Sequence, residues 1–121
     1  MTLFEIDGKE YELKLTYKAI KLLNDSFEGG NYEVIGKALQ GDVDAFPNIV
    51  HAALIHTGEN ISRKKVEEVV EQKVDDGKLS LDDIAKISDK VVTQSFFYKP
   101  TVEKMMKKNP EMAKAIAQLR D

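Results

Sequence analysis

The chain has 121 residues, and 32% of them are charged. Its formal net charge is −3, and it contains no cysteine. This length fits one domain, and the mixing of both charge signs leaves no basic stripe of the kind that binds a phosphate backbone, which argues against a nucleic-acid partner. The lack of cysteine excludes disulfides, thiolate nucleophiles and cysteine-based zinc sites.

The first predicted element is a β-hairpin over residues 3–15. Asp7-Gly8 separates two runs that alternate apolar and polar residues, and both residue types tolerate the positive φ angles of a type I′ turn. A two-residue turn places Ile6 opposite Lys9. Alternation then puts five apolar side chains on one face of the hairpin: Phe4, Ile6, Tyr11, Leu13 and Leu15. Because an isolated hairpin is marginal in water, helices or a neighbouring subunit must cover this face.

A series of amphipathic helices is predicted after the hairpin, because apolar residues then recur at spacings of three and four. The predicted helical stretches, each opened by a capping residue, are Thr16–Gly29, Asn31–Gly41, Asp44–Gly58, Ser62–Gly77 and Ser80–Phe96. The second carries Tyr32, Ile35 and Leu39 on its apolar face. The third, where Pro47 is tolerated in the first turn, is expected to be the most buried.

Lys99-Pro100 is expected to break the helical pattern, with Thr101 capping the next helical piece up to Lys108, and a last piece is expected around Asn109-Pro110. The predicted fold is mainly α with an N-terminal β-hairpin, an α+β fold that forms a small helical cluster. We expect residues 1–98 to form the hairpin-plus-helix domain and residues 99–121 to be a C-terminal helical extension, either packed on that domain or a flexible arm.

The sequence lacks the residue patterns typical of catalysis or cofactor binding. His51 and His56, the only histidines, are about 140° apart around a helix and therefore do not predict a metal site. Asp42 and Asp44 precede a helix and are interpreted as caps. Neither a phosphate-binding glycine loop nor a nucleophile elbow occurs. We therefore expect a protein that is not an enzyme and that needs no metal or cofactor.

Nothing in the sequence indicates a membrane or an export route. Apolar runs stay short of the ~18 residues typical of a membrane span, and the N-terminus lacks the basic segment and apolar run of a signal peptide. We expect a cytoplasmic protein without a membrane partner.

Two apolar clusters near the C-terminus are candidates for binding another protein. The three consecutive aromatic residues at 96–98 cannot all point into one core from a helix. Either two of the rings close the end of the core with the tyrosine at its edge, or the cluster is a docking surface. The methionines of the C-terminal segment suit partner helices and core packing about equally. The predicted partner-binding residues are Phe96, Phe97, Tyr98, Met105, Met106 and Met112.

Several stretches form one pattern along the chain: FEIDGKEYELKLTYKAIKLL, GDVDAFPNIVHAALIH, a charged helix opening ISRKKVEEVVE, and FF near the end. This combination resembles the tail assembly chaperones of long-tailed bacteriophages and prophages of Gram-positive bacteria, over residues 3 to about 98. The resemblance implies a non-enzymatic protein of the host bacterial cytoplasm that binds the long helical tape measure protein and assists polymerisation of the tail tube protein around it.

The free edges of the predicted hairpin would also allow a homo-oligomer, because unpaired strand edges can pair with another copy. The alternative function is a small cytoplasmic regulatory or adaptor protein that binds one folded partner.

Overall fold

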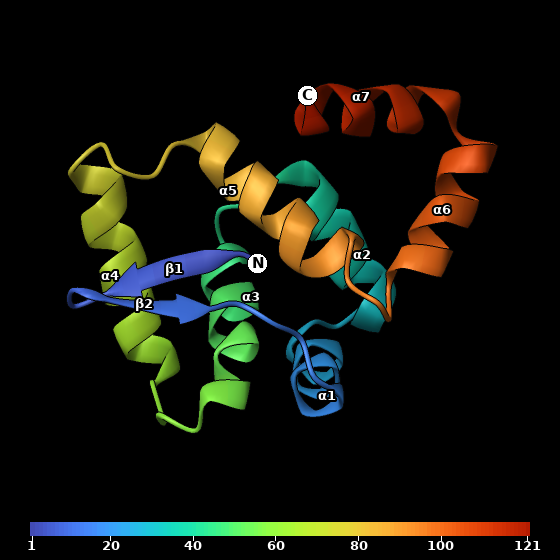
Figure 1. The fold of residues 1–121 in the computed structure, drawn as a ribbon. Helices are drawn as coiled ribbons and strands as arrows, with labels where there is room; N and C mark the ends of the chain where they lie inside the picture. Colours follow the sequence, from blue (N-terminus) through green and yellow to red (C-terminus); the bar gives the residue numbers. More distant parts are fainter.

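The computed structural model describes residues 1–121 and confirms a mainly α fold with an N-terminal β-hairpin (Figure 1). The elements in chain order are β1 (Leu3–Ile6), β2 (Lys9–Glu12), α1 (Tyr17–Ser26), α2 (Gly30–Gln40), α3 (Phe46–Ala53), a 3-10 turn η1 (Ile55–Thr57), α4 (Arg63–Asp75), α5 (Leu81–Ser88), a π-helical turn η2 (Asp89–Thr93), α6 (Lys99–Lys108) and α7 (Pro110–Arg120). None of these helices combines the length and the apolar character needed to cross a membrane.

The hairpin has the predicted turn and register. Asp7 and Gly8 have φ angles of 52° and 84°, as a type I′ turn requires, and Phe4 lies opposite Tyr11. The ring of Phe4 is buried and meets Phe46 of α3 edge-on, with 6.3 Å between the ring centroids. The apolar face is therefore covered by the helices of the same chain.

Ion pairs attach the tip of the hairpin to α4. Lys65 lies 2.9 Å from the Asp7 carboxylate, and Lys73 lies 3.2 Å from that of Glu5. Lys73 also stands over the ring of Phe4, 5.2 Å from its centroid. Such exposed pairs stabilise a fold only slightly, so burial of the apolar face remains the main reason that the hairpin stays in place.

The third helix is the most buried, as predicted, but its boundaries differ from the prediction. It begins at Phe46 without a side-chain cap, so neither Asp42 nor Asp44 is its N-cap, and Asp42 instead accepts a hydrogen bond of 2.8 Å from the Ala45 N–H in the turn that leads into the helix. The helix ends at Ala53, because the chain tightens there into η1, which closes at Gly58 with a φ of 71°. A turn thus occupies each end of the stretch that was predicted to be one helix.

The predicted apolar face of α2 is partly wrong. Its buried residues are Val34, Ile35 and Ala38, and Tyr32 is 74% exposed. Tyr32 lies about 110° around the helix from the centre of this buried face. Leu39 is partly buried at the margin.

The predicted fifth helix is too long at its C-terminal end. Regular α-helix stops at Ser88, and the chain continues as η2 and then as an irregular segment over residues 94–98. Lys99 and Pro100 open α6 and do not break a helix, because a proline in the first turn lacks only an N–H that would have no helical partner. Thr101 lies inside α6 and is therefore not a cap.

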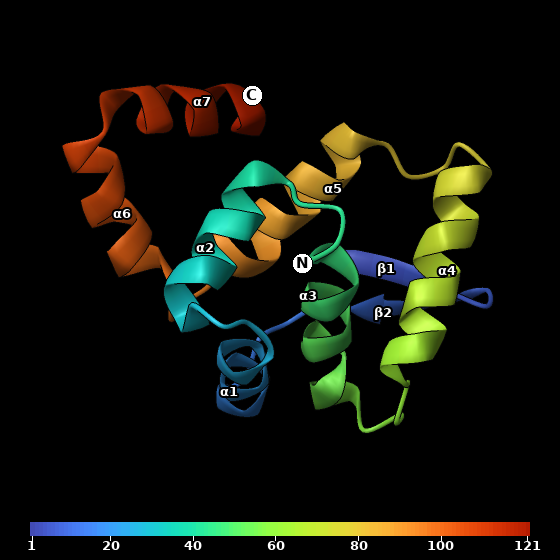
Figure 2. The same ribbon diagram turned by 180° about the vertical axis from the view of Figure 1, so that it is seen from behind.

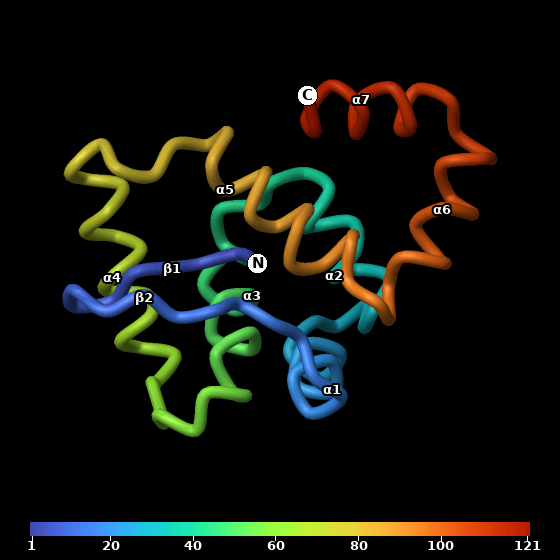
Figure 3. Tube along the Cα trace, in the orientation of Figure 1, coloured from blue at the N-terminus to red at the C-terminus, as the bar shows by residue number.

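The last two helices form an arm that leaves the body and folds back over it. Figures 1 and 2 show α6 running away from the end of α5, and the trace in Figure 3 shows α7 turning back so that the C-terminus lies near α2 and α5. Val102 of α6 and Ile116 of α7 are buried in the common core. The arm therefore packs on the rest of the chain, while the domain boundary at residue 98 stays a prediction.

Candidate interaction surface

Two aromatic side chains near the C-terminus face solvent. Phe96 is 96% exposed and Phe97 is half-exposed, and both belong to the irregular segment between η2 and α6. Ser95 in the same segment donates its hydroxyl to the carbonyl oxygen of Val92 at 2.5 Å. The segment is therefore tied to the end of η2 while it presents two apolar rings to water.

The third aromatic residue, Tyr98, is part of the core. Its side chain is only 2% exposed, and its hydroxyl donates a 2.8 Å hydrogen bond to the Asn31 side-chain oxygen. Burial raises the pKa of Tyr98 to about 12. The interpretation in which two phenylalanines close the core and the tyrosine lies at its edge is wrong, because Asn31 gives the buried hydroxyl a partner.

A further exposed ring follows Asn31, the hydrogen-bond partner of Tyr98, in the chain. Asn31 precedes Tyr32 in the first turn of α2, and Figures 1 and 2 both show that turn beside the segment leading to α6. The exposed ring is that of Tyr32, which is 74% exposed. Sequence reasoning missed Tyr32 because it was assigned to the buried face of its helix.

The methionines lie away from the aromatic segment, Met105 and Met106 in the C-terminal half of α6 and Met112 in the first turn of α7. Met105, Met106 and Met112 are partly buried and pack against the core. Met106 lines a cleft of about 130 Å³ together with Val102 and Arg120. The structure therefore separates the aromatic cluster from the methionine cluster. The methionines pack where the arm meets the body and do not form a freely exposed stripe.

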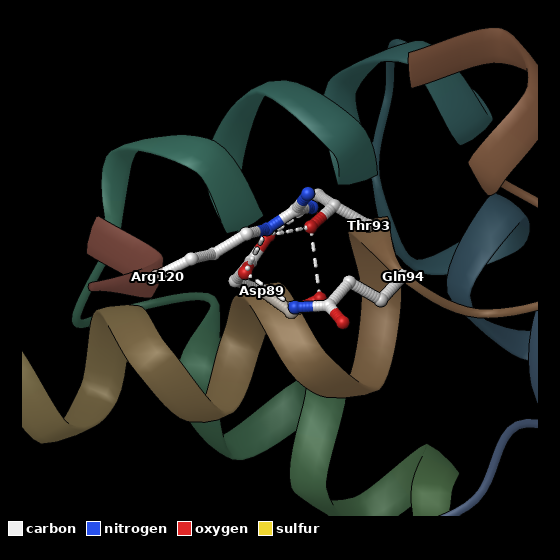
Figure 4. Close-up of polar contacts among 4 residues, drawn as sticks. All are labelled: Asp89, Thr93, Gln94 and Arg120. Atoms are coloured by element: carbon white, nitrogen blue, oxygen red, sulfur yellow. Dashed lines mark hydrogen bonds and ion pairs between the residues drawn. The ribbon is translucent and has the colours of Figure 1, made fainter. Parts of the chain in front are cut away.

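A buried carboxylate joins α7 to the body of the molecule (Figure 4). Asp89, at the start of η2, is 2% exposed. Arg120 donates to both of its oxygens, from Nε at 2.9 Å and from Nη2 at 3.0 Å. Gln94 donates from Nε2 at 2.7 Å, and the Thr93 hydroxyl donates as well. Sequence reasoning missed this group, because Asp89 lies between Ser88 and Lys90 and nothing local distinguishes it from a solvated acid.

The environment of Asp89 makes its ionised form favourable. Burial opposes ionisation of the carboxyl, but the hydrogen bonds from Arg120, Thr93 and Gln94 outweigh burial and hold the pKa of Asp89 below its ordinary value of 3.8. A lowered pKa in the folded state means that the charge stabilises the fold above the unfolded-state pKa. This contribution is lost as the pH falls below 3.8 through the lower folded-state pKa.

We therefore expect the Asp89→Asn variant to be less stable than the parent at neutral pH, and the difference between the two to shrink as the pH falls below 3.8. Urea unfolding of both proteins at a series of pH values measures this difference. If the difference in unfolding free energy between the two proteins stays constant down to the lowest pH measured, the ionised carboxylate does not stabilise the fold.

The two histidines serve separate parts of the structure. His51 is half-buried in α3, and burial, with a smaller effect of Arg63, lowers its pKa. His56 donates from Nε2 to the carbonyl oxygen of Glu12 at 2.7 Å and so links η1 to β2. No group of three or more histidine, cysteine, aspartate or glutamate side chains is placed to hold a metal ion.

The chain matches the model of a known protein family. The model of the family described as phage tail assembly chaperone protein, TAC, matches residues 3–107. The match spans the hairpin, α1–α5 and nearly all of α6, and it ends before α7 begins at Pro110. Searches of curated proteins and of solved structures returned no match.

Proposed function

Because the chain belongs to the phage tail assembly chaperone family, we propose that it binds the tape measure protein and assists polymerisation of the tail tube protein around it. The proposed role is non-enzymatic and is carried out in the cytoplasm of the host bacterium. The family match over residues 3–107 is the observation that carries this proposal.

The physical task of such a chaperone is to cover apolar surface. A long helical partner that is exposed before the tube surrounds it would aggregate through its apolar stripes. A chaperone surface that buries part of such a stripe prevents this aggregation, and it does not require one particular sequence in the partner helix. Many weakly bound copies along one partner gain strength from multivalency.

The proposed contact region is the C-terminal aromatic and methionine region. Phe96 and Phe97 supply exposed apolar area directly, and the buried Tyr98 holds the segment that carries them. Met105, Met106 and Met112 contribute where the arm packs on the body, and their flexible thioether side chains adapt to varied neighbours.

Copies of the chaperone would also contact one another along the partner. The sheet has only two strands, so each strand keeps one edge without a neighbouring strand, and such edges can pair with another copy. His56 already occupies the carbonyl oxygen of Glu12 on β2. The edge of β1 is therefore the proposed site of this pairing.

Co-expression with the tape measure protein tests the function. We expect the tape measure protein to be recovered in the soluble fraction with several copies of this chain bound, and to be insoluble when expressed alone. A tape measure protein that stays insoluble would contradict the proposal. A complex with one copy of a single folded protein instead would favour the adaptor alternative.

The Phe96→Asp variant tests the contact region. Phe96 is almost fully exposed, so its replacement should change the free energy of unfolding by less than ~0.5 kcal/mol. Loss of its apolar area and addition of a charge should reduce the amount of soluble tape measure protein severalfold.

The matched control for this variant is Leu81→Asp. Leu81 is 65% exposed at the first turn of α5, the end of that helix remote from Phe96. The Leu81→Asp variant should solubilise the tape measure protein as well as the parent does. Equal activity of Phe96→Asp and Leu81→Asp would place the contact region elsewhere.

A further inference from the structure

The charges of the chain are divided unevenly between the body and the arm. Residues 1–98 carry 12 lysine and arginine residues against 18 acidic residues, whereas residues 99–121 carry six against three. The body therefore has a formal net charge of −6, and the arm formed by α6 and α7 has a formal net charge of +3. Opposite charges on two parts of one chain favour contact between the arm of one copy and the body of another.

Three lysines form the basic face of α6. Lys104, Lys107 and Lys108 are exposed and are spaced three and four residues apart, so they lie on one side of the helix. The opposite side carries Val102, which is buried in the core. None of the three ammonium groups makes an ion pair within the chain. The basic face of α6 therefore points away from the body with its charges unpaired.

The outer face of the hairpin carries negative charge. Glu5 lies directly opposite Glu10 in the register of the two strands, and Glu12 follows Glu10 on the same face. Carboxylates placed opposite each other across two strands repel. Lys73 pairs with Glu5 at 3.2 Å, but no cation of the same chain pairs with Glu10 or Glu12. This face therefore has two carboxylates that a cation from another molecule can neutralise.

The basic face of α6 and the outer face of the hairpin cannot meet within one molecule. Figures 1 and 2 show the hairpin and α6 on opposite sides of the fold, with α2 and α5 between them. A contact between two different faces of identical chains is heterologous, and it repeats from copy to copy unless the rotation closes a ring. Such a contact arranges copies in a row, as a coat along a long partner requires.

We propose that the basic face of α6 in one copy docks on the outer face of the hairpin in the next copy, so that the copies join head to tail. Leu3, which is 46% exposed opposite Glu12 on the hairpin, adds apolar area that this contact would cover. The contact uses side chains and is separate from backbone pairing of the β1 edges. Its purpose, to line copies up along the tape measure protein, rests on the proposed function.

Self-association of the purified full chain tests the contact without the tape measure protein. We expect the average mass in sedimentation velocity to rise with protein concentration at about 0.01 M salt. The association constant should fall about tenfold at about 1 M salt, because the Debye length shrinks from about 30 Å to about 3 Å. A chain that stays monomeric at low salt would overturn the inference. Association that salt does not weaken would indicate pairing through the β1 edges alone, which also overturns it.

Two charge-reversed variants locate the contact. The arm variant carries Lys104→Glu, Lys107→Glu and Lys108→Glu, and the hairpin variant carries Glu10→Lys and Glu12→Lys. Each should remain monomeric at low salt, because its arm and its hairpin then have the same sign of charge. An equimolar mixture of the two should associate again, because each arm then meets a hairpin of opposite charge. A mixture that stays monomeric would overturn the proposed pairing of faces.

A third variant controls for net charge. Lys18, Lys21 and Lys64 are exposed, belong to the body and form no ion pair. Their joint replacement by glutamate changes the net charge as much as the arm variant does, and it should leave self-association close to that of the parent. Equal loss in this control and in the arm variant would mean that net charge alone decides association, which overturns the inference.

Co-expression with the tape measure protein separates this inference from the proposed function. A parent chain that stays monomeric by itself but still solubilises the tape measure protein would overturn the head-to-tail contact and leave the function intact. An arm variant that self-associates like the parent but no longer solubilises the tape measure protein would show that the lysines contact that partner, which also overturns the contact between copies.

Discussion

Replacing Tyr98 by alanine should lower the free energy of unfolding by about 3–5 kcal/mol, the range typical of large aromatic truncations in a core. The ring is fully enclosed, meets Phe97 edge-on at 5.1 Å between centroids, and carries the hydroxyl that bonds to Asn31. Its removal leaves a cavity where the irregular segment, α2 and α6 meet. Urea unfolding monitored by circular dichroism measures the loss.

Two neighbouring substitutions make this result specific. Tyr98→Phe keeps the ring and removes only the hydrogen bond to Asn31, so it should cost about 1 kcal/mol. Phe96→Ala removes an exposed ring and should change stability by less than ~0.5 kcal/mol. Similar losses for Tyr98→Ala and Phe96→Ala would contradict the assignment of one ring to the core and the other to the surface.

Replacing Gly41 by alanine should lower the free energy of unfolding by about 3 kcal/mol. Gly41 ends α2 with a φ of 64°, in the left-handed region. A Cβ atom there would lie 2.9 Å from the Cβ and 3.2 Å from the Cα of Ala85 in α5. Backbone strain and a clash between two packed helices therefore act together.

Gly8→Ala is the matched control for this prediction. Gly8 also has a positive φ, 84°, but a Cβ there would meet no atom within 4 Å. Only the backbone strain applies, and we expect a loss of about 1 kcal/mol. Thermal unfolding of both variants compares the two losses, and equal losses would mean that α2 and α5 approach less closely than the structure indicates.

Among the features that the sequence predicted are those made by residues close together along the chain. The turn at Asp7-Gly8 follows from the backbone freedom of two adjacent residues. Thr16 and Ser62 cap their helices through N–H groups three residues ahead, and Ser80 forms a capping box with Asp83. The family pattern is likewise read along the chain, and it did not require knowledge of which surfaces are exposed.

The tertiary structure decided which side chains of an apolar or charged stretch are enclosed. Tyr98 is in the core and Phe96 in water because the partner of the tyrosine hydroxyl, Asn31, stands 67 positions earlier in the chain. Asp89 is buried because Arg120, 31 residues later, returns on α7 to neutralise it. Local periodicity reports only on neighbours within a turn or two of helix, and it therefore could identify neither of these two distant partners.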